Sequence, residues 1–483
     1  MVKNRMLKRA CLLLIILMQY FRVAAGQQMY WLPADRAGDR QTLFNYFEQS
    51  PLLGLDPHDY AYTLVQQLKA GSAPADSAAA DKQLSEAAIA FFTDVAYGTK
   101  VTRVGYDGLK YTPDCRDIPQ LLHQALADNT FGQLLNKLEP TCPEYRSIKS
   151  MIAVYTRRLQ ESSYHPVKIS SDLVDSSNHP LIEKLYQLGC LDTISYSIQE
   201  DTLRTRVRAA QRLFEFMEDG ALRRGVLEEL NISLEKRLSE LKHALNTYRW
   251  LNCVRQYQSV IVVNIPAAGL YLYQGDSLLL YSRTIVGKEA TPTSPLTSSI
   301  DEIIMYPYWT VPYNIATREL LPGIKGNPVA YLDAGNYQVL DKSGKILDPS
   351  TINWSSLSRT NFPYTIRQMN GCDNSLGIIK LNFFNPYSTY LHDTPGKSYF
   401  MFNKRYFSHG CIRVEDAIPL AKLLLPEEAQ RIDSLEKAAA APQKGPVSIQ
   451  VKQKTPLFIL YEVAWPDQQG SIRFYDDVYN KFR

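Results

Sequence analysis

The chain has 483 residues, of which 45% are hydrophobic and 21% are charged, as in ordinary soluble globular proteins. This length is enough for two to four domains, each with its own core. The formal net charge of +4 falls to about −1 when the five basic residues among the first 26 are set aside, which argues against nucleic acid as a partner.

The first 26 residues are typical of a secretory signal peptide. Basic residues at positions 3, 5, 8 and 9 precede an apolar run at residues 10–20, and Ala-Ala-Gly follows at 24–26. The run is shorter than the roughly 20 residues that a spanning helix needs, so we expect cleavage after Gly26 rather than an uncleaved anchor. No later run is long and apolar enough to span a membrane, so we expect no integral span after cleavage.

Six cysteines remain after such a cleavage, and an exported protein can form disulfides. We expect Cys115 to pair with Cys142 first, and Cys190 with Cys253 next, although the sequence leaves the connectivity open. A working thiol would leave another cysteine single.

Residues 27 to about 165 predict a mainly helical region. Helical patches occur at residues 42–47, 60–68, 83–97 and 145–159. Residues 70–80, which are small and polar, predict a surface loop or linker.

A second helical unit is predicted at about 178–250. Ser233 is expected to cap a long helix in which leucines recur at positions 234, 238, 241 and 245. We interpret this leucine stripe as packing against neighbouring helices.

The spacing of the hydrophobic residues changes from a helical to a strand pattern at Ser259. Residues 257–480 therefore predict a mainly β domain. Strands are expected at residues 259–265, 270–273, 278–286, 446–451 and 456–464. A short helix is expected at 416–425, before a low-complexity segment at 437–446. Residues 306–377 form an insertion rich in Pro, Gly, Asn and Tyr, with a helix-like patch at 315–321. Such a long insertion more often shapes a binding site than a core.

The chemistry-bearing residues gather in residues 390–414, which contain a thiol, two imidazoles and a guanidinium. A cysteine nucleophile needs an imidazole or a helix N-terminus to generate thiolate, and Cys411 has His392, His409 and the nearby predicted helix. Gly410 would let a substrate carbonyl approach the backbone, whose N–H groups could form an oxyanion hole.

Two other interpretations stay open on these residues alone. His392, His409 and Cys411 are all metal-ligand types, but no fourth Cys or His stands at ligand spacing. Cys411 could also be a buried structural thiol, because free cysteines are among the most buried residues.

The run SHGCIR, with a histidine nineteen residues before its cysteine in YLHDTP, resembles the L,D-transpeptidase (YkuD-type) catalytic motif. The flanking runs VVNIPAAGLYLY, TIVGKEATPT and DNSLGIIKLNF agree with it. Together they are similar to the large periplasmic subgroup of that family. The resemblance implies an α+β multidomain fold with a signal peptide (1–26), a helical scaffold domain (27–170), a peptidoglycan-binding-like helical domain (171–254) and a mainly β catalytic domain (255–483), whose capping insertion spans about 306–377.

The resemblance also implies residue roles. Cys411 would be the nucleophile and His392 the base, while His409 would orient the site. The backbone near Gly410 and Cys411, with Tyr390, would hold the oxyanion. Arg413 would order the loop or engage a substrate carboxylate, and Ser408 would be a local hydrogen-bonding residue.

The implied activity is acyl transfer from a peptidoglycan stem tetrapeptide, with release of D-Ala, to a diamino-acid side-chain amine, which gives 3→3 crosslinks. Alternatives are an L,D-carboxypeptidase and a non-catalytic wall-binding scaffold. No cofactor or metal is expected, and the expected partners are stem peptides, glycan and other wall-synthesis proteins in the periplasm. Two features depart from the family pattern: an incomplete DG-x-x-G-x-x-T core at 178–232, and Cys372, for which a redox disulfide with Cys411 is one hypothesis.

Overall fold

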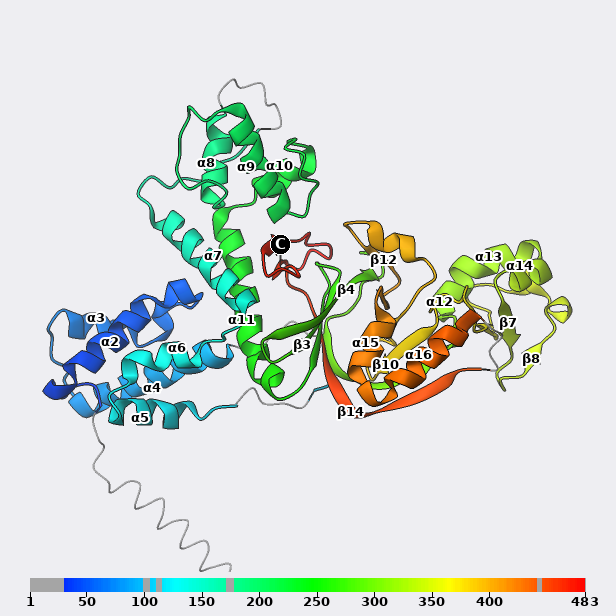
Figure 1. Cartoon of the computed structure of the whole chain (residues 1–483), viewed down its shortest axis with the longest axis horizontal. Helices are drawn as coiled ribbons and strands as arrows, with labels where there is room; N and C mark the ends of the chain where they lie inside the picture. Colours follow the sequence, from blue (N-terminus) through cyan, green and yellow to red (C-terminus); the bar gives the residue numbers. More distant parts are fainter. Residues whose placement is uncertain (1–29, 99–104, 110–114, 171–177, 441–444, 483) are drawn as a thin grey trace, which may run out of the picture. The chain divides into compact units, whose positions relative to one another are not determined.

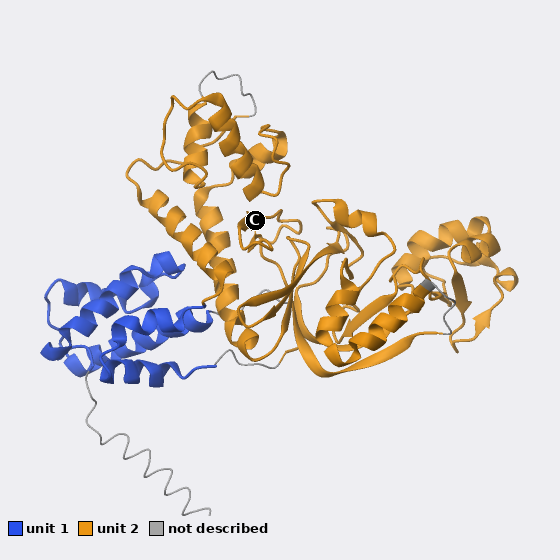
Figure 2. Ribbon diagram, viewed as in Figure 1, with its two compact units in different colours: residues 1–99, 114–140 blue, residues 100–113, 141–483 orange. Residues whose placement is uncertain are grey.

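The computed structural model of this chain describes residues 30–98, 105–109, 115–170, 178–440 and 445–482. The expected signal peptide lies outside the described residues. The chain divides into two compact units (Figure 2): unit 1 comprises residues 1–99 and 114–140, and unit 2 comprises residues 100–113 and 141–483. The expected domain boundaries at residues 170 and 254 fall inside unit 2 and stay predictions.

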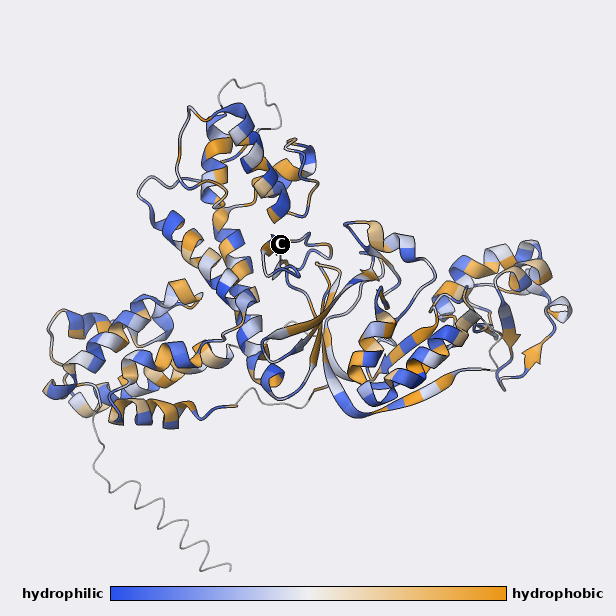
Figure 3. Ribbon diagram, viewed as in Figure 1, coloured by the Kyte–Doolittle hydropathy of each residue, from blue (hydrophilic) through white to orange (hydrophobic). Residues whose placement is uncertain are grey.

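Unit 1 is a helical assembly with an aromatic core. Phe47 and Phe91 are buried and pack edge to face, with their ring centroids 5.5 Å apart. In Figure 3 hydrophobic and hydrophilic residues alternate along its helices, as expected when each helix buries one face. These helices are α2 (Ala37–Glu48), α3 (Tyr62–Lys69), α4 (Ser77–Tyr97), α5 (Ile118–Ala127) and α6 (Leu134–Leu138).

Helix α4 begins earlier than the sequence predicts. The Asp76 carboxylate accepts the backbone N–H groups of Ala78 and Ala79 at 2.9 and 3.0 Å. An aspartate cap followed by alanines favours a helix, and this outweighs the small, polar composition of the segment. The prediction of a loop was therefore wrong for residues 77–80.

The helical part of unit 2 packs on a long helix, α11 (Leu234–Tyr257). The Ser233 hydroxyl accepts the N–H of Lys236 at 3.3 Å, which confirms the predicted cap. The four leucines of the stripe are buried, which confirms their interpretation as packing residues. Farther along α11, Tyr248 stacks on Trp465 with ring centroids 4.6 Å apart. The other helices are α7 (Pro143–Gln160), α8 (His179–Gln187), α9 (Glu200–Leu213) and α10 (Arg224–Leu230).

The rest of unit 2 is built on one large sheet that closes on itself. Strand β14 (Val447–Leu460) pairs in parallel with β2 (Val260–Asn264) and antiparallel with β5 (Leu296–Met305), while the path β5-β10-β11-β13-β4-β3-β2 joins the same two strands. The ring encloses an aliphatic core. Its remaining strands are β3 (Gly269–Gln274), β4 (Ser277–Gly287), β10 (Ile379–Phe383), β11 (Leu391–His392) and β13 (Ile412–Val414). The expected α+β multidomain class is confirmed.

Three features of this sheet differ from the sequence-based expectations. Residues 446–464 were expected to form two strands, but β14 is continuous and passes a register shift between Gln450 and Thr455. A polar run interrupts the hydrophobic pattern there without breaking the strand. Strand β1 (Tyr106–Asp107), in a region expected to be helical, pairs in parallel with β5. A hairpin of β15 (Ala464–Pro466) and β16 (Ile472–Phe474) was not predicted.

The capping insertion, residues 306–377, has its own sheet, ordered β6-β9-β7-β8, and its own apolar cluster around Ile324, Leu332 and Ile366. It leaves the large sheet after β5 and returns at β10 (Figure 1). Its elements are β6 (Trp309–Thr310), α12 (Tyr313–Ile315), η5 (Ala316–Leu320), α13 (Leu321–Gly326), α14 (Pro328–Ala334), β7 (Tyr337–Leu340), β8 (Ile346–Leu347) and β9 (Thr365–Gln368).

The expected disulfide pairs are wrong. Cys142 and Cys190 are free thiols, whereas Cys115 and Cys253 are disulfide-bonded. Cys142 is buried, and its sulfur accepts a hydrogen bond from Arg255 at 3.7 Å. Spacing along the chain does not reveal which thiols the fold brings together.

Candidate active site

The nucleophile loop, residues 408–411, joins β12 (Tyr406–Ser408) to β13. The Ser408 hydroxyl donates to the Cys411 carbonyl at 2.5 Å and accepts the Gly410 N–H at 3.2 Å. Gly410 adopts φ +110°, a backbone conformation that side chains disfavour. Ser408 and Gly410 together therefore hold the tight turn that presents Cys411.

A second segment, residues 287–293, is hydrogen-bonded to this loop. The Thr293 hydroxyl donates to the Gly410 carbonyl at 2.9 Å and accepts the Gly287 N–H at 2.9 Å. The Tyr479 hydroxyl donates to the Gly287 carbonyl at 2.6 Å and accepts the Thr293 N–H at 3.1 Å. The sequence predicted no role for Thr293 or Tyr479. Thr293 ends the run TIVGKEATPT, and none of the quoted runs contains Tyr479.

His392 is only 4% exposed, and its Nδ1 lies 2.5 Å from the Asp393 carbonyl oxygen. A carbonyl can only accept, so Nδ1 carries a proton and Nε2 of the neutral ring keeps its lone pair. Burial, followed by the charge of Arg413, lowers the pKa of His392 to about 3. The ring is therefore neutral at pH 7 and can accept a proton.

The Cys411 sulfur lies among groups that shift its pKa in opposite directions. The thiol donates to the Ser388 carbonyl oxygen at 3.9 Å. Burial raises the pKa of Cys411, while the Tyr390 donors and the charges of Lys380 and Arg413 lower it. The expectation that His392 lies within hydrogen-bond reach of this sulfur stays a prediction.

His409 points toward the capping insertion. Its Nε2 lies 2.8 Å from Oε1 of Glu319, which belongs to η5. The two side chains are 31% and 49% exposed, so water screens the contact in part. The fold thus joins the nucleophile loop to the insertion through this pair.

Arg413 is half-buried on β13, and its Nε is buried with no hydrogen-bond partner. Burial lowers the pKa of Arg413, whereas Tyr399 and Cys411 raise it. A buried guanidinium without a partner is costly, so this position favours an anion.

A cavity of about 570 Å³ opens between the capping insertion and the large sheet, beside Cys411. Its lining is mainly aromatic and aliphatic, which suits a peptide. The lining residues are Tyr308, Trp309, Thr310, Val311, Pro312, Tyr313, Ala316, Tyr364, Thr365, Ile366, Leu376, Lys380, Ser388 and Tyr390.

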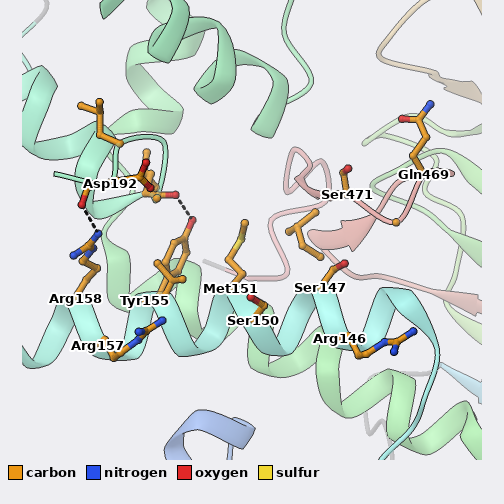
Figure 4. Close-up of a pocket in the computed structure, with 16 residues that line it drawn as sticks. Arg146, Ser147, Ser150, Met151, Tyr155, Arg157, Arg158, Asp192, Gln469 and Ser471 are labelled. Atoms are coloured by element: carbon orange, nitrogen blue, oxygen red, sulfur yellow. Dashed lines mark hydrogen bonds between the residues drawn. The ribbon is translucent and has the colours of Figure 1, made fainter. Parts of the chain in front are cut away.

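A larger hollow of about 850 Å³ lies along α7, opposite the turn between β15 and β16 (Figure 4). Arg146, Arg157 and Arg158 line it, and Figure 4 shows Arg158 bonded to the Asp192 carbonyl. Its lining contains none of the candidate site residues, whereas Ser388, which the Cys411 thiol contacts, lines the smaller cavity.

Other chemistry finds little support in the described residues. Among them, no cluster of three or more His, Cys, Asp or Glu side chains could hold a metal ion. Within the same residues, every helix is too short or too polar to cross a bilayer. Cys372 and Cys411 are both free thiols, and the Cys372 sulfur contacts the Ala439 carbonyl at 3.5 Å.

Two parts of the chain match known protein families. Residues 258–449 match the L,D-transpeptidase catalytic domain (YkuD), and residues 18–151 match the Scaffold domain. A Haemophilus influenzae protein named "Putative L,D-transpeptidase" is 35% identical over 238 residues, which cover 49% of this chain and 47% of that protein. The chain thus spans about half the length of this curated relative.

Two solved structures share low identity with the chain. An L,D-transpeptidase from Mycobacterium smegmatis is 14% identical, with 42% of this chain and 58% of that chain covered and a TM-score of 0.19. The Ldtfm-avibactam carbamoyl enzyme is 11% identical, with 42% and 48% covered and a TM-score of 0.18. The domain matches carry the assignment: the chain contains an L,D-transpeptidase catalytic domain together with a scaffold domain, as the motif predicted.

Proposed function

We propose that the chain is a peptidoglycan L,D-transpeptidase that works through a thioester on Cys411. One observation carries the proposal: the Cys411 thiol contacts the carbonyl oxygen of Ser388 at 3.9 Å, and Ser388 lines a peptide-sized cavity. His392, with a proton held on Nδ1 and a free Nε2, supplies a base on the same sheet.

The first half of the reaction is acylation. The Cys411 proton passes to Nε2 of His392 as sulfur attacks the carbonyl of the L-centred third residue of a stem tetrapeptide. The carbon–nitrogen bond to D-Ala breaks, the amine takes the proton from His392, and a thioester remains. The backbone near Gly410 and Cys411, with Tyr390, would hold the developing oxyanion.

The second half is transfer. The side-chain amine of a diamino acid on another stem attacks the thioester and gives a proton to His392, which returns it to sulfur as the carbon–sulfur bond breaks. The product is an amide that links two third residues. Arg413 would hold a substrate carboxylate, His409 would fix the capping insertion through Glu319, and Ser408 and Gly410 would shape the loop.

Before substrate binds, Cys411 is a thiol and His392 is a neutral imidazole. The pKa of Cys411 is raised and that of His392 is lowered, so the thiolate–imidazolium ion pair is disfavoured before substrate binds. Proton transfer then accompanies attack, which protects the thiol from adventitious electrophiles.

The proposed setting is the periplasm, at the cell wall, after export and removal of residues 1–26. The proposed partners are stem peptides and glycan strands together with other wall-synthesis proteins. The helical unit at 171–254 would act as the peptidoglycan-binding-like domain. The cell-wall substrate of L,D-transpeptidase domains supports this setting.

Intact-mass spectrometry of the purified chain with a stem tetrapeptide, and separately with a carbapenem, tests the proposal. We expect one covalent adduct, lost in Cys411→Ala and kept in Cys372→Ala, which removes an exposed free thiol. An adduct that persists in Cys411→Ala, or its absence from the unaltered chain, overturns the proposal. Product analysis then separates 3→3 dimers from the tripeptide that water would release.

A further inference from the structure

Lys380 stands in a row of three basic side chains across the sheet. It is the antiparallel register partner of His392, which is the parallel register partner of Arg413. Register partners on neighbouring strands project to the same face of a sheet. Lys380 therefore shares the face that carries His392 and Arg413, although the run DNSLGIIKLNF, which contains it, gave it no role.

The ammonium group of Lys380 is held close to the nucleophile. Its Nζ lies 4.1 Å from the centre of the Tyr390 ring, and its charge lowers the pKa of Cys411. Burial lowers the pKa of Lys380, while the neighbouring Cys411 and Glu302 raise it. The side chain is thus partly desolvated beside the reacting sulfur.

Protein carboxylates do not neutralise this cation. Glu302, the acid that influences it, already accepts hydrogen bonds from Asn382 at 2.8 Å, Ser448 at 2.5 Å and Gln450 at 3.2 Å. Within the described part of the chain, Lys380 makes no ion pair. A partly buried ammonium without a carboxylate is costly and favours an anionic ligand.

The cavity beside Cys411 indicates what kind of ligand would pair with the charge of Lys380. Lys380 is the only charged residue among the fourteen that line it, all of which the structure describes. An aromatic cavity with one cation selects a ligand that is largely apolar and carries a negative group at that end. Stem peptides contain carboxylates, and the proposed reaction brings one to this position.

We propose that Lys380 is a specificity-determining residue that pairs with a carboxylate of the donor peptide. The inference rests on the proposed function, since it takes the donor to be a stem tetrapeptide. The pairing adds a contact beyond those of Arg413 and places the donor along the cavity. Three carboxylates could serve: those of the terminal D-Ala, of the diamino acid and of the glutamate residue.

Binding without turnover tests the pairing directly. In a Cys411→Ala background, calorimetry compares a tetrapeptide with free carboxylates against three peptides, each amidated at one carboxylate. Lys380→Gln should weaken binding of the free peptide by about tenfold to a hundredfold, the range for a hydrogen bond to a charged group. It should not change the affinity for the peptide amidated at the partner carboxylate, which identifies that group.

Matched variants make the outcomes decisive. Lys422→Gln removes a partly exposed lysine that pairs with Asp433, and should bind like the background. Lys380→Arg should keep most of the affinity because the charge is kept, and thermal unfolding checks that each variant folds. Equal weakening for the free peptide and all three amidated peptides overturns the inference, as does unchanged binding by Lys380→Gln.

Alkylation separates this role from a purely electrostatic effect on the thiol. With the native cysteine, the rate of Cys411 alkylation by neutral iodoacetamide should change less than about twofold between wild type and Lys380→Gln, because the pairing acts through the ligand. A large fall in this rate with unchanged peptide binding assigns Lys380 to thiolate stabilisation and rejects the inference. Failure of the unaltered chain to form any acyl adduct would count against the proposed function instead.

Discussion

His409 and Glu319 join the nucleophile loop to the capping insertion, with Nε2 and Oε1 2.8 Å apart. The histidine lies one residue before Gly410, and the glutamate belongs to η5, whose first residue, Ala316, lines the cavity beside Cys411. Movement of the insertion would therefore displace both the loop and the lining of the cavity. We expect His409 to act as a positioning residue through this pair.

Glu319→Gln should lower kcat/KM about two- to fivefold without a comparable loss of stability. The pair is partly exposed, and such pairs contribute about 0.2–1 kcal/mol. Steady-state kinetics at low and high salt measures the effect, which should shrink as salt screens the pair. Asp333→Asn, on α14 of the same insertion, should leave kcat/KM unchanged. A salt-independent loss, or equal losses in both variants, would contradict the role.

Thr293→Val should reduce kcat more strongly than its cost in stability explains. The variant removes a donor to the part-buried Gly410 carbonyl and an acceptor for the buried Gly287 N–H. Leaving a buried group unpaired costs about 1–3 kcal/mol. Thr297→Val is the matched control, since that buried hydroxyl donates to Asp107 at 2.7 Å, away from the loop. Urea unfolding and kcat at saturating donor should separate the two: both lose stability, and only Thr293→Val loses turnover.

Gly410→Ala should fold but lose most of its turnover. A side chain at φ +110° costs about 1–3 kcal/mol, and the backbone can relieve it only by moving Cys411. Gly344→Ala, at φ +84° with open space around it, imposes similar strain far along the insertion. We expect comparable thermal shifts and a kcat loss confined to Gly410→Ala. Normal kcat in Gly410→Ala would show that the loop tolerates a shift.

His392 should make the fold sensitive to acid. Its pKa is near 6.5 in the unfolded chain and about 3 in the folded one, so the unfolded chain binds more protons between these values. The free energy of unfolding therefore has its full value, as far as His392 is concerned, above about pH 6.5. It falls by about 1.4 kcal/mol per pH unit as the pH drops from there toward about 3.

Urea unfolding at pH 7, 5.5 and 4.5 measures this linkage. His392→Asn keeps a donor for the Asp393 carbonyl and should lose less stability on acidification than the unaltered chain. His179→Gln, which changes an exposed histidine, should keep the original pH dependence. The linkage is rejected if His392→Asn and the unaltered chain lose stability in parallel.

The sequence by itself determined the features that depend on neighbouring residues. The cap at Ser233, the buried stripe of α11 and the run SHGCIR are local, because helix signals and the family motif lie within one stretch of chain. The motif was enough to predict a catalytic domain that the comparisons support. Local composition failed where a single residue outweighed it, as Asp76 does at the start of α4.

Only the tertiary structure decided which distant residues serve Cys411. Thr293 reaches the loop across about 120 positions of chain, and Tyr479 bonds Thr293 across about 190. Lys380 enters because β10 and β11 pair in one register rather than another. The disulfide-bonded cysteines were likewise not those that spacing suggested. The physical reason is the same in each case: strand register and loop packing set distances between side chains, and separation along the chain does not.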